Sequence, residues 1–388
     1  MLKCASVYTY EIDDQEVALA EIKAQLEKKI TLLEHSVGII MCNPEFITSG
    51  VVKHICCNLP FDMAGITTAS QAVNDEFGEL ILTIFVMTSD DVCFKTGVTD
   101  SLNEGVDEPV RAAYEKAAAC SPELPKLAIL FPPFLIKQYA GDVYLKAWKK
   151  VIPNASLFGT LAIDDTVSFN ECETIYNGMN KKDAMSFVLC YGNINPRFLI
   201  ASLPQNSTVH LRAEVTESNG SLIHKINHMN ARKFFEDIGI YNENMLMVPF
   251  FVDLKKRDDY DGVPVVNGVA TFTEDGSSLF CGDVDEGSVF SLLSFTKDDI
   301  LSTSLSEINR INEQTSVNGA LLFSCFARRV VLLGANNPSA ELQIAKDVIN
   351  PDIPFMMGYS GGEFCPTSVK NGVPTNRFHT YSLIILVI

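Results

Sequence analysis

The sequence predicts an α/β fold of mixed α+β character, built as two layered halves whose mixed parallel and antiparallel sheets are covered by helices. Three observations predict it. A strand–helix–strand–turn–strand unit occurs three times, two hairpins separate its second copy from its third, and 388 residues are enough for two domains with a core each. We place the first domain over residues 1–205 and the second over residues 206–388.

The first expected element is a helix over residues 13–29, which read DDQEVALAEIKAQLEKK. Its acidic residues come first, where a helix N-terminus favours negative charge. Four apolar residues follow at roughly helical spacing, namely Val17, Leu19, Ile22 and Leu26. We expect this face of the helix to pack on a sheet.

The repeated unit begins with a short apolar strand, passes through a helix to a second apolar strand that ends in a loop of small residues, and closes with a further apolar strand. Its copies span residues 37–87, 127–202 and 319–388. Their helices are expected near residues 50–58, 141–150 and 340–348. Because a strand–helix–strand connection favours parallel strands, we expect the first two strands of each copy to be parallel and the closing strand to be antiparallel to them.

Two hairpins are expected between the second and third copies. Asn219-Gly220 and Asp275-Gly276 each separate alternating apolar and polar residues, as a tight hairpin turn requires. The division between the halves therefore falls near residues 204–207. No proline-rich, glycine-rich or serine-rich linker is present, so we expect the halves to be in firm contact, and such interfaces often form binding clefts.

Charge and cysteine usage exclude several classes of partner. The net charge is −18 and no long basic run occurs, so nucleic acid and anionic membranes are not expected to bind. The 11 cysteines are scattered through apolar segments, which is typical of buried thiols in a reducing compartment. No signal peptide or apolar run of bilayer length is present, so we expect a cytoplasmic protein without membrane insertion.

The turns that end the second strand of each copy are the candidate ligand site. Such turns expose backbone N–H groups and small hydroxyls at the end of the sheet where ligands usually bind. The candidate ligand-binding residues in these turns are Gly65, Thr67, Thr68, Gly159, Thr160, Asp164, Tyr359, Ser360, Gly361 and Glu363. The alternative is that the glycines only permit close packing or a positive φ angle.

Arg328 completes the set of candidate ligand-binding residues. It follows a buried strand, in a segment with few other cations. Its guanidinium suits a two-pronged contact with a ligand carboxylate, or else a structural ion pair with Glu363.

Histidine and cysteine patterns give weaker signals, and we assign no catalytic residue and no metal ligand. His224 and His228 have the spacing of a helical metal pair, but the preceding turn places His224 on a strand. His379 is a possible axial ligand for haem, or a hydrogen-bonded structural residue. Cys325 and Cys365 are possible nucleophiles but have no protease or hydrolase motif around them.

Five segments resemble the paired FIST N-terminal and FIST C-terminal domains, a family named for its occurrence in F-box and intracellular signal-transduction proteins. In the first half they read FDMAGITT and LFGTLAIDD, and in the second ALLFSCFARR, GYSGGEFCP and FHTYSLIIL. The resemblance covers nearly the whole chain, and the three segments of the second half have the order and spacing of the family.

The resemblance implies an intracellular sensory protein that binds a small molecule, amino acids or other carboxylated metabolites among them. Members are usually joined to output domains, and none is seen in this sequence, so we expect signalling through a separate partner protein. No cofactor is expected. Haem remains possible because some bacterial members are haem-based nitric oxide sensors, and an enzyme acting on a small carboxylated metabolite is the other alternative.

Overall fold

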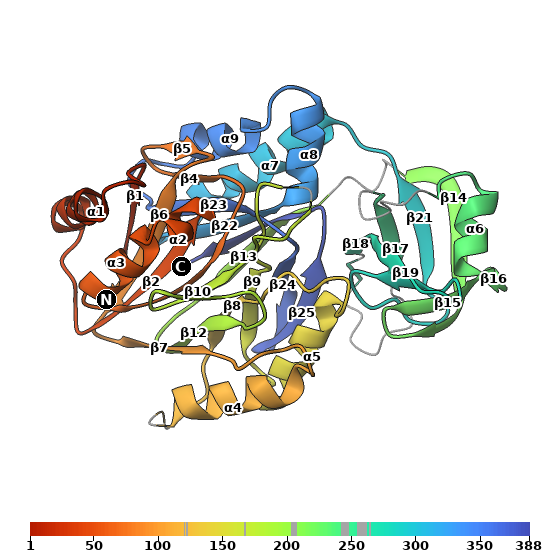
Figure 1. Cartoon of the computed structure of the whole chain (residues 1–388), viewed down its shortest axis with the longest axis horizontal. Helices are drawn as coiled ribbons and strands as arrows, with labels where there is room; N and C mark the ends of the chain where they lie inside the picture. Colours follow the sequence, from red (N-terminus) through yellow and green to blue (C-terminus); the bar gives the residue numbers. More distant parts are fainter. Residues whose placement is uncertain are drawn as a thin grey trace.

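The structure of the chain is a computed structural model that describes residues 1–119, 121, 123–166, 168–202, 208–241, 248–253, 262–263 and 265–388. It confirms the α/β class, because helices cover sheets that contain both parallel and antiparallel strands (Figure 1). The boundary expected between residues 205 and 206 lies outside the described residues and stays a prediction.

The first repeat unit forms the centre of a six-stranded sheet. Its strands are, in spatial order, β1 (Lys3–Thr9), β6 (Leu82–Ser89), β2 (His35–Cys42), β3 (Asp62–Thr67), β10 (Thr174–Tyr176) and β11 (Met179–Lys181). Strands β2 and β3 are parallel, and β6 runs antiparallel to β2, as expected.

The second repeat unit forms the centre of a sheet with the same layout. Its strands are β7 (Val92–Val98), β12 (Ser186–Gly192), β8 (Leu127–Phe131), β9 (Ser156–Thr160), β24 (Glu363–Lys370) and β25 (Val373–His379). Here too the first two strands of the unit, β8 and β9, are parallel, and the closing strand β12 is antiparallel to β8.

The third repeat unit repeats the layout once more. Its sheet contains β13 (Arg197–Ala201), β26 (Leu383–Val387), β22 (Ala320–Cys325), β23 (Phe355–Ser360), β4 (Gln71–Val73) and β5 (Phe77–Gly78). Strands β22 and β23 are parallel and β26 is antiparallel to β22. The predicted strand directions are therefore confirmed in all three units.

The three sheets exchange hairpins in a cycle. The hairpin that follows β3 joins the third sheet, the hairpin that follows β9 joins the first sheet, and the hairpin that follows β23 joins the second sheet. Strands from residues 1–205 and from residues 206–388 therefore share hydrogen bonds in two of these sheets. The two ranges are interlocked through their backbones.

The helices lie on the outer faces of the sheets (Figure 1). They are α1 (Gln15–Lys29), α2 (Glu45–Thr48), α3 (Val51–Asn58), α4 (Asp107–Ala118), α5 (Gly141–Val151), α7 (Lys297–Asn312), α8 (Phe326–Gly334) and α9 (Ala340–Val348). The four helices expected from the sequence are confirmed as α1, α3, α5 and α9. Asp14 caps α1, but Val17 is 43% exposed, so its expected place on the packed face is wrong, and Ala18 lies there instead.

An outlying unit, drawn in green and teal at the right of Figure 1, contains both expected hairpins. Its elements are β14 (Thr208–Asn219), β15 (Leu222–Ile226), β16 (Met229–Asn230), α6 (Ala231–Asp237), β17 (Phe250–Asp253), β18 (Val265–Asn267), β19 (Val269–Phe272), β20 (Ser278–Phe280) and β21 (Val289–Leu293). It has a phenylalanine-rich core of its own, in which Phe235, Phe250 and Phe290 contact one another.

Three hydrogen bonds join the outlying unit to the three-sheet core. The amide N–H of Gly141 at the start of α5 donates to Cys281 O at 2.7 Å, and the amide N–H of Asp283 donates to the Asp142 carboxylate at 2.8 Å. On the core side, the Thr380 hydroxyl donates to Val266 O at 2.9 Å. Within the described residues, no helix is both long and apolar enough to cross a bilayer.

Candidate functional site

The three turns predicted as the ligand site meet at the centre of the core, where the exchanged hairpins leave their own sheets. The amide N–H of Ile163 in the second turn donates to Thr67 O in the first turn at 3.1 Å. The amide N–H of Tyr359 in the third turn donates to Ser70 O beside the first turn at 3.2 Å. These bonds bring together segments that are about 100 and about 290 residues apart along the chain.

The second and third turns are joined most closely. Leu161 N–H donates to Gly362 O at 3.0 Å, and Gly361 N–H donates to Leu161 O at 3.1 Å. The Thr160 hydroxyl also donates to Gly362 O at 3.0 Å. These bonds use backbone groups that the sequence suggested for a ligand, so at this junction the turns bind one another.

Close packing accounts for the glycines of the three second strands. Gly65, Gly159 and Gly358 occupy the same register position opposite the first strand of their units. A Cβ atom at Gly65 would lie 1.7 Å from Ile40 O, and one at Gly159 would lie 2.0 Å from Leu130 O. This is the close-packing role that the sequence left open as the alternative.

The threonines of the first turn are directed into the protein. Thr67 and Thr68 are fully buried. The Thr67 hydroxyl accepts from the Glu173 amide at 2.9 Å, and the Thr68 hydroxyl accepts from the Gln71 side chain. Neither threonine, nor Gly65, lines the cavity described below.

Asp164 shapes the loop that follows the second turn. Its fully buried carboxylate accepts hydrogen bonds from the amide and the hydroxyl of Thr166, both at 2.7 Å, and from the amide of Glu171 at 2.8 Å. Carboxylates suit this role because they accept several N–H and O–H donors at once. The loop it holds carries Phe169 to the cavity.

A narrow cavity opens beside the second and third turns. Its volume, measured as the space open to the centre of a water molecule, is about 40 Å³. The third repeat unit contributes the largest share of its wall. The residues from this unit are Cys325, Phe326, Ala327, Ser360, Gly361, Thr380 and Tyr381. This volume holds a few waters or a small ligand part.

The rest of the wall comes from two other parts of the chain. The second repeat unit contributes Phe134, Ile136, Ile163 and Phe169, and the outlying unit contributes Gly268 and Cys281. Phe169 joins the aromatic part of the wall, with ring centroids 4.9 Å from Phe134 and 5.7 Å from Phe326. The cavity thus lies between the core and the outlying unit.

Two aromatic residues of the wall have strained backbones. Phe169 has a φ of 54° and Tyr381 a φ of 57°, a left-handed region that bulky residues rarely adopt. Strain of this kind costs of order 1–3 kcal/mol and is concentrated at functional sites. Its presence at two wall residues favours this cavity as the site of function.

Cys325 and Glu363 form a buried pair beside the cavity. Cys325 ends β22, immediately before α8, and lines the cavity, whereas Glu363 lies behind it and is fully buried. The Ser360 hydroxyl donates to Glu363 Oε1 at 2.9 Å, and Glu363 Oε2 has no hydrogen-bond partner among the described residues. Apart from the interaction of the carboxyl group with the neighbouring Cys325 thiol, one of its oxygens is therefore unsatisfied.

Burial controls the protonation of this pair. It raises the pKa of Glu363 well above the usual range, against the opposing effects of the Ser360 hydrogen bond and the nearby Arg328 charge. Burial and the neighbouring Glu363 raise the pKa of the Cys325 thiol well above its usual value. The raised pKa disfavours the thiolate form of Cys325, which makes it a poor nucleophile, and it favours the protonated form of Glu363, which can donate a hydrogen bond.

Cys365, the other candidate nucleophile, is fully buried and does not line the cavity. Its pKa is raised by burial and by Glu363. Tyr359, predicted in the same turn as Ser360, is also fully buried, and its hydroxyl donates to Pro338 O at 3.2 Å. Of the predicted ligand-binding residues, Ser360 and Gly361 line the cavity directly.

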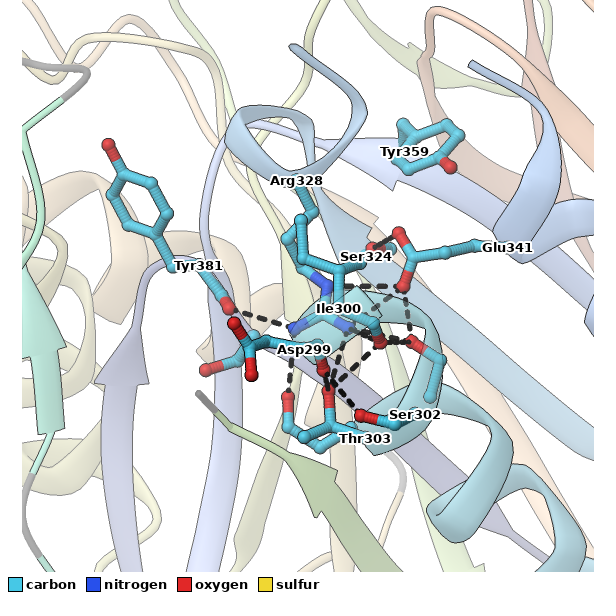
Figure 2. Close-up of polar contacts among 12 residues, drawn as sticks. Asp299, Ile300, Ser302, Thr303, Ser324, Arg328, Glu341, Tyr359 and Tyr381 are labelled. Carbon is cyan, nitrogen blue, oxygen red and sulfur yellow. Dashed lines mark hydrogen bonds and ion pairs between the residues drawn. The ribbon is translucent and has the colours of Figure 1, made fainter. Parts of the chain in front are cut away.

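Arg328 binds Glu341, so the ion pair with Glu363, one of the two alternatives that the sequence left open, does not form. Its Nε and Nη2 atoms donate to Glu341 Oε1 at 3.1 and 2.9 Å, and both side chains are fully buried (Figure 2). Nη1 donates to Tyr381 O at 3.1 Å, and Nη2 also donates to Ile300 O at 3.2 Å. Each guanidinium nitrogen is occupied by the protein.

The described residues do not fit a haem at His379. The imidazole is 4% exposed, its Nε2 lies 3.1 Å from Cys365 O, and it does not line the cavity. The cavity is also far too narrow for a porphyrin. His224 lies on β15, as expected, where its Nδ1 is 2.9 Å from the Ser277 hydroxyl.

Sequence reasoning missed the apolar half of the site. Phe134, Ile136 and Phe169 follow no motif and resemble ordinary core residues. Gly268 and Cys281 lie in the outlying unit, far along the chain from the repeat units. The one usable signal was the repeat itself, because a segment after β8 in the second unit corresponds to Cys325–Ala327 after β22 in the third.

The fold defines an α/β protein of three interlocked sheets, with a narrow cavity where the core meets an outlying unit. The FIST N domain model matches residues 36–229, and the FIST C domain model matches residues 230–366. The chain belongs to the FIST family, whose domains are associated with signal transduction and small-ligand sensing. No match is found among curated proteins.

Proposed function

We propose that this protein is a cytoplasmic sensor that binds a small molecule in the cavity and signals through a separate partner protein. The main support for the proposal is the composition of the cavity wall. Two repeat units and the outlying unit each supply part of this wall. Ligands commonly bind at such junctions between structural units.

A ligand in this position would act on the arrangement of the core and the outlying unit. It would contact Gly268 and Cys281 on one side and Ala327 and Gly361 on the other. A ligand shifts a conformational equilibrium only by its difference in affinity for the two states. A ligand that needs both walls favours the arrangement in which they face each other.

The Arg328 network offers a route from the cavity to the outer helices. Tyr381 lines the cavity, and its carbonyl accepts from Arg328, which in turn binds Glu341 on α9 and Ile300 O on α7 (Figure 2). A ligand that moves Tyr381 would therefore disturb bonds that hold α7, α8 and α9 together. We propose the outer surface of these helices as the contact site for the partner.

The experiment is a thermal-shift screen of small metabolites, with two alanine variants as a matched pair. Ala327 lines the cavity in the first turn of α8, and Ala340 lies in the first turn of α9 outside it; each is 8% exposed. Ala327→Leu fills the cavity, whereas Ala340→Leu adds the same bulk elsewhere. A ligand at about a hundred times its Kd adds about 2.7 kcal/mol, a shift of a few degrees.

The proposal predicts a shift in the wild type and in Ala340→Leu that is lost in Ala327→Leu. Hydrogen exchange of α7–α9 should slow or quicken on addition of the same ligand. A ligand whose shift survives Ala327→Leu binds elsewhere and contradicts the proposed site. No shift above about one degree across the screen would count against a sensor altogether.

A further inference from the structure

The wall of the cavity carries no formal charge. Among the described residues, those that line it are aromatic, aliphatic, glycine, hydroxyl or thiol residues, and none is a lysine, arginine, histidine, aspartate or glutamate. Phe134, Phe169, Phe326 and Tyr381 are its aromatic residues, and Ser360 and Thr380 are its aliphatic hydroxyl residues. The shape and chemistry fit an apolar body with a small polar head.

The nearby cations are not available to an anionic ligand. The Arg328 guanidinium is fully buried and engaged by Glu341 and by backbone carbonyls. The Arg329 guanidinium binds Glu79 through Nη2 and lies 5.8 Å from the ring of the wall residue Phe326. Its buried Nε has no hydrogen-bond partner among the described residues, but Arg329 does not line the cavity. A carboxylate in the cavity would therefore lose its hydration without gaining a counter-ion, which is strongly unfavourable.

A buried carboxyl group contacts the cavity-lining residue Ser360. Glu363 lies behind Ser360 and Cys325, its Oε2 has no hydrogen-bond partner among the described residues, and no cation contacts it within salt-bridge distance there. Burial favours the protonated form of Glu363, and this carboxyl offers no positive charge to balance an anionic ligand. A neutral ligand avoids the cost of burying an unpaired charge and can still donate hydrogen bonds to the hydroxyl oxygens of Ser360 and Thr380.

We propose that the cavity binds a small neutral molecule with an aromatic or branched aliphatic body and a hydrogen-bonding head, and that it rejects carboxylates. This inference rests on the proposed function for the place where the ligand binds, and it goes further by naming the ligand class. It replaces the carboxylated metabolite that the family resemblance implied, because Arg328, the predicted anchor for a carboxylate, is engaged by Glu341.

The test compares neutral and anionic probes of the same shape on the full chain at pH 7. The pairs are benzamide with benzoate and isobutyramide with isobutyrate, titrated by ligand-observed NMR up to about 20 mM. Each amide should bind at least about tenfold more tightly than its carboxylate, since stripping an unpaired charge of water costs more than the roughly 1.4 kcal/mol that a factor of ten represents.

Variants show whether the probes bind in the cavity. Ala327→Leu should weaken the amides at least about tenfold, and Ala340→Leu should leave them within about threefold of the wild type. Ile136→Phe fills the cavity from the second repeat unit and serves in place of Ala327→Leu if that protein does not fold. The melting temperature of each variant is measured first.

The possible outcomes separate the two proposals. Carboxylates that bind as tightly as the amides, with the same loss in Ala327→Leu, would overturn the neutral ligand class and leave the proposed site intact. If the affinity for the amides is unchanged in both Ala327→Leu and Ile136→Phe, the proposed site and this inference are both overturned. Absence of binding by every probe at 20 mM would also overturn the inference.

Discussion

The guanidinium Nη2 of Arg328 lies 2.9 Å from the Glu341 carboxylate, and both side chains are fully buried. The pair joins α8 to α9, and the Ser304 hydroxyl of α7 contacts both the Arg328 Nη2 at 2.7 Å and Glu341 Oε1 at 2.5 Å. Three helices thus depend on one ion pair. A buried pair of this kind is costly to break, because either partner alone becomes an uncompensated charge.

Arg328→Leu should lower the free energy of unfolding by about 3–5 kcal/mol, and so should Glu341→Leu. The double variant should recover a large part of that loss, because neither charge remains buried alone. Recovery should be incomplete, since Ile300 O and Tyr381 O lose a donor. Urea unfolding of the wild type, the two single variants and the double variant gives the coupling free energy between Arg328 and Glu341.

Arg328→Leu combined with Glu363→Leu is the matched control, because Glu363 does not bind Arg328. The stability changes of the two single variants should simply add in this double variant. Equal recovery in both double variants would show that the local charge balance matters and that the specific Arg328–Glu341 contact does not.

The three equivalent glycines should differ in how well they tolerate alanine. At Gly65 and Gly159 a Cβ would meet a backbone carbonyl, whereas at Gly358 it would meet the tip of the Met41 side chain at 2.3 Å. A side chain can move aside, but a strand backbone cannot do so without breaking its sheet. We expect losses of about 3 kcal/mol or more at the first two sites and about 1 kcal/mol at Gly358.

Gly372→Ala separates steric conflict from backbone strain. Gly372 has a φ of 78°, but a Cβ there would meet no atom within 4 Å. It should lose about 1 kcal/mol through strain alone. Chemical unfolding ranks the four variants, and a Gly65→Ala protein as stable as Gly372→Ala would contradict the close packing of β2 on β3.

Local patterns were sufficient to predict the units of this fold. The apolar strands of the repeat, the helix that Asp14 caps and the hairpin at Asn219-Gly220 each depend on residues close together in the sequence, and each is confirmed. The hairpin exchange was not predictable in this way. Strand β4 pairs with β23 through only three residues, nearly 300 positions away, and no local pattern specifies such a partner.

The site was predictable only in part for the same reason. Ser360 and Gly361 were found because a turn of small residues is a local feature. The partner of Arg328 was not found, because Glu341 is chosen by how α8 packs against α9 and not by spacing. The aromatic wall was missed because Phe134 and Phe169 differ from core phenylalanines only in what they face.

Glu363 should make stability depend on pH. Its pKa in the folded protein is raised above the value of 4.5 of an unperturbed carboxyl, so the folded protein holds a proton that the unfolded chain releases. The stability it contributes is fully present below about pH 4.5 and is lost as the pH rises through the folded pKa. The slope approaches about 1.4 kcal/mol per pH unit within this window.

Glu363→Gln keeps the shape of the side chain and removes the titration. The variant should show a smaller decline in unfolding free energy between pH 5 and pH 8 than the wild type. Urea unfolding at pH 4, where the wild-type carboxyl is protonated in both states, gives the reference difference between the proteins. Parallel pH profiles over the whole range would refute the raised pKa.

Because the sheets exchange hairpins, we expect that neither residues 1–205 nor residues 206–388 fold alone. In a fragment of residues 1–205, the β4–β5 hairpin lacks its partner β23, and β9 lacks its neighbour β24. Both open edges would expose backbone groups and apolar surface that the full chain buries. We expect the separate fragments 1–205 and 206–388 to show no cooperative unfolding by circular dichroism and poorly dispersed amide NMR spectra.

The control is the full chain with a protease site inserted between residues 205 and 206 and cut after folding. The two pieces should stay associated and unfold cooperatively, because the sheets are already complete. A fragment 1–205 that unfolds in a single sharp transition with dispersed amide resonances would show that the interlocked strands are dispensable to the first domain.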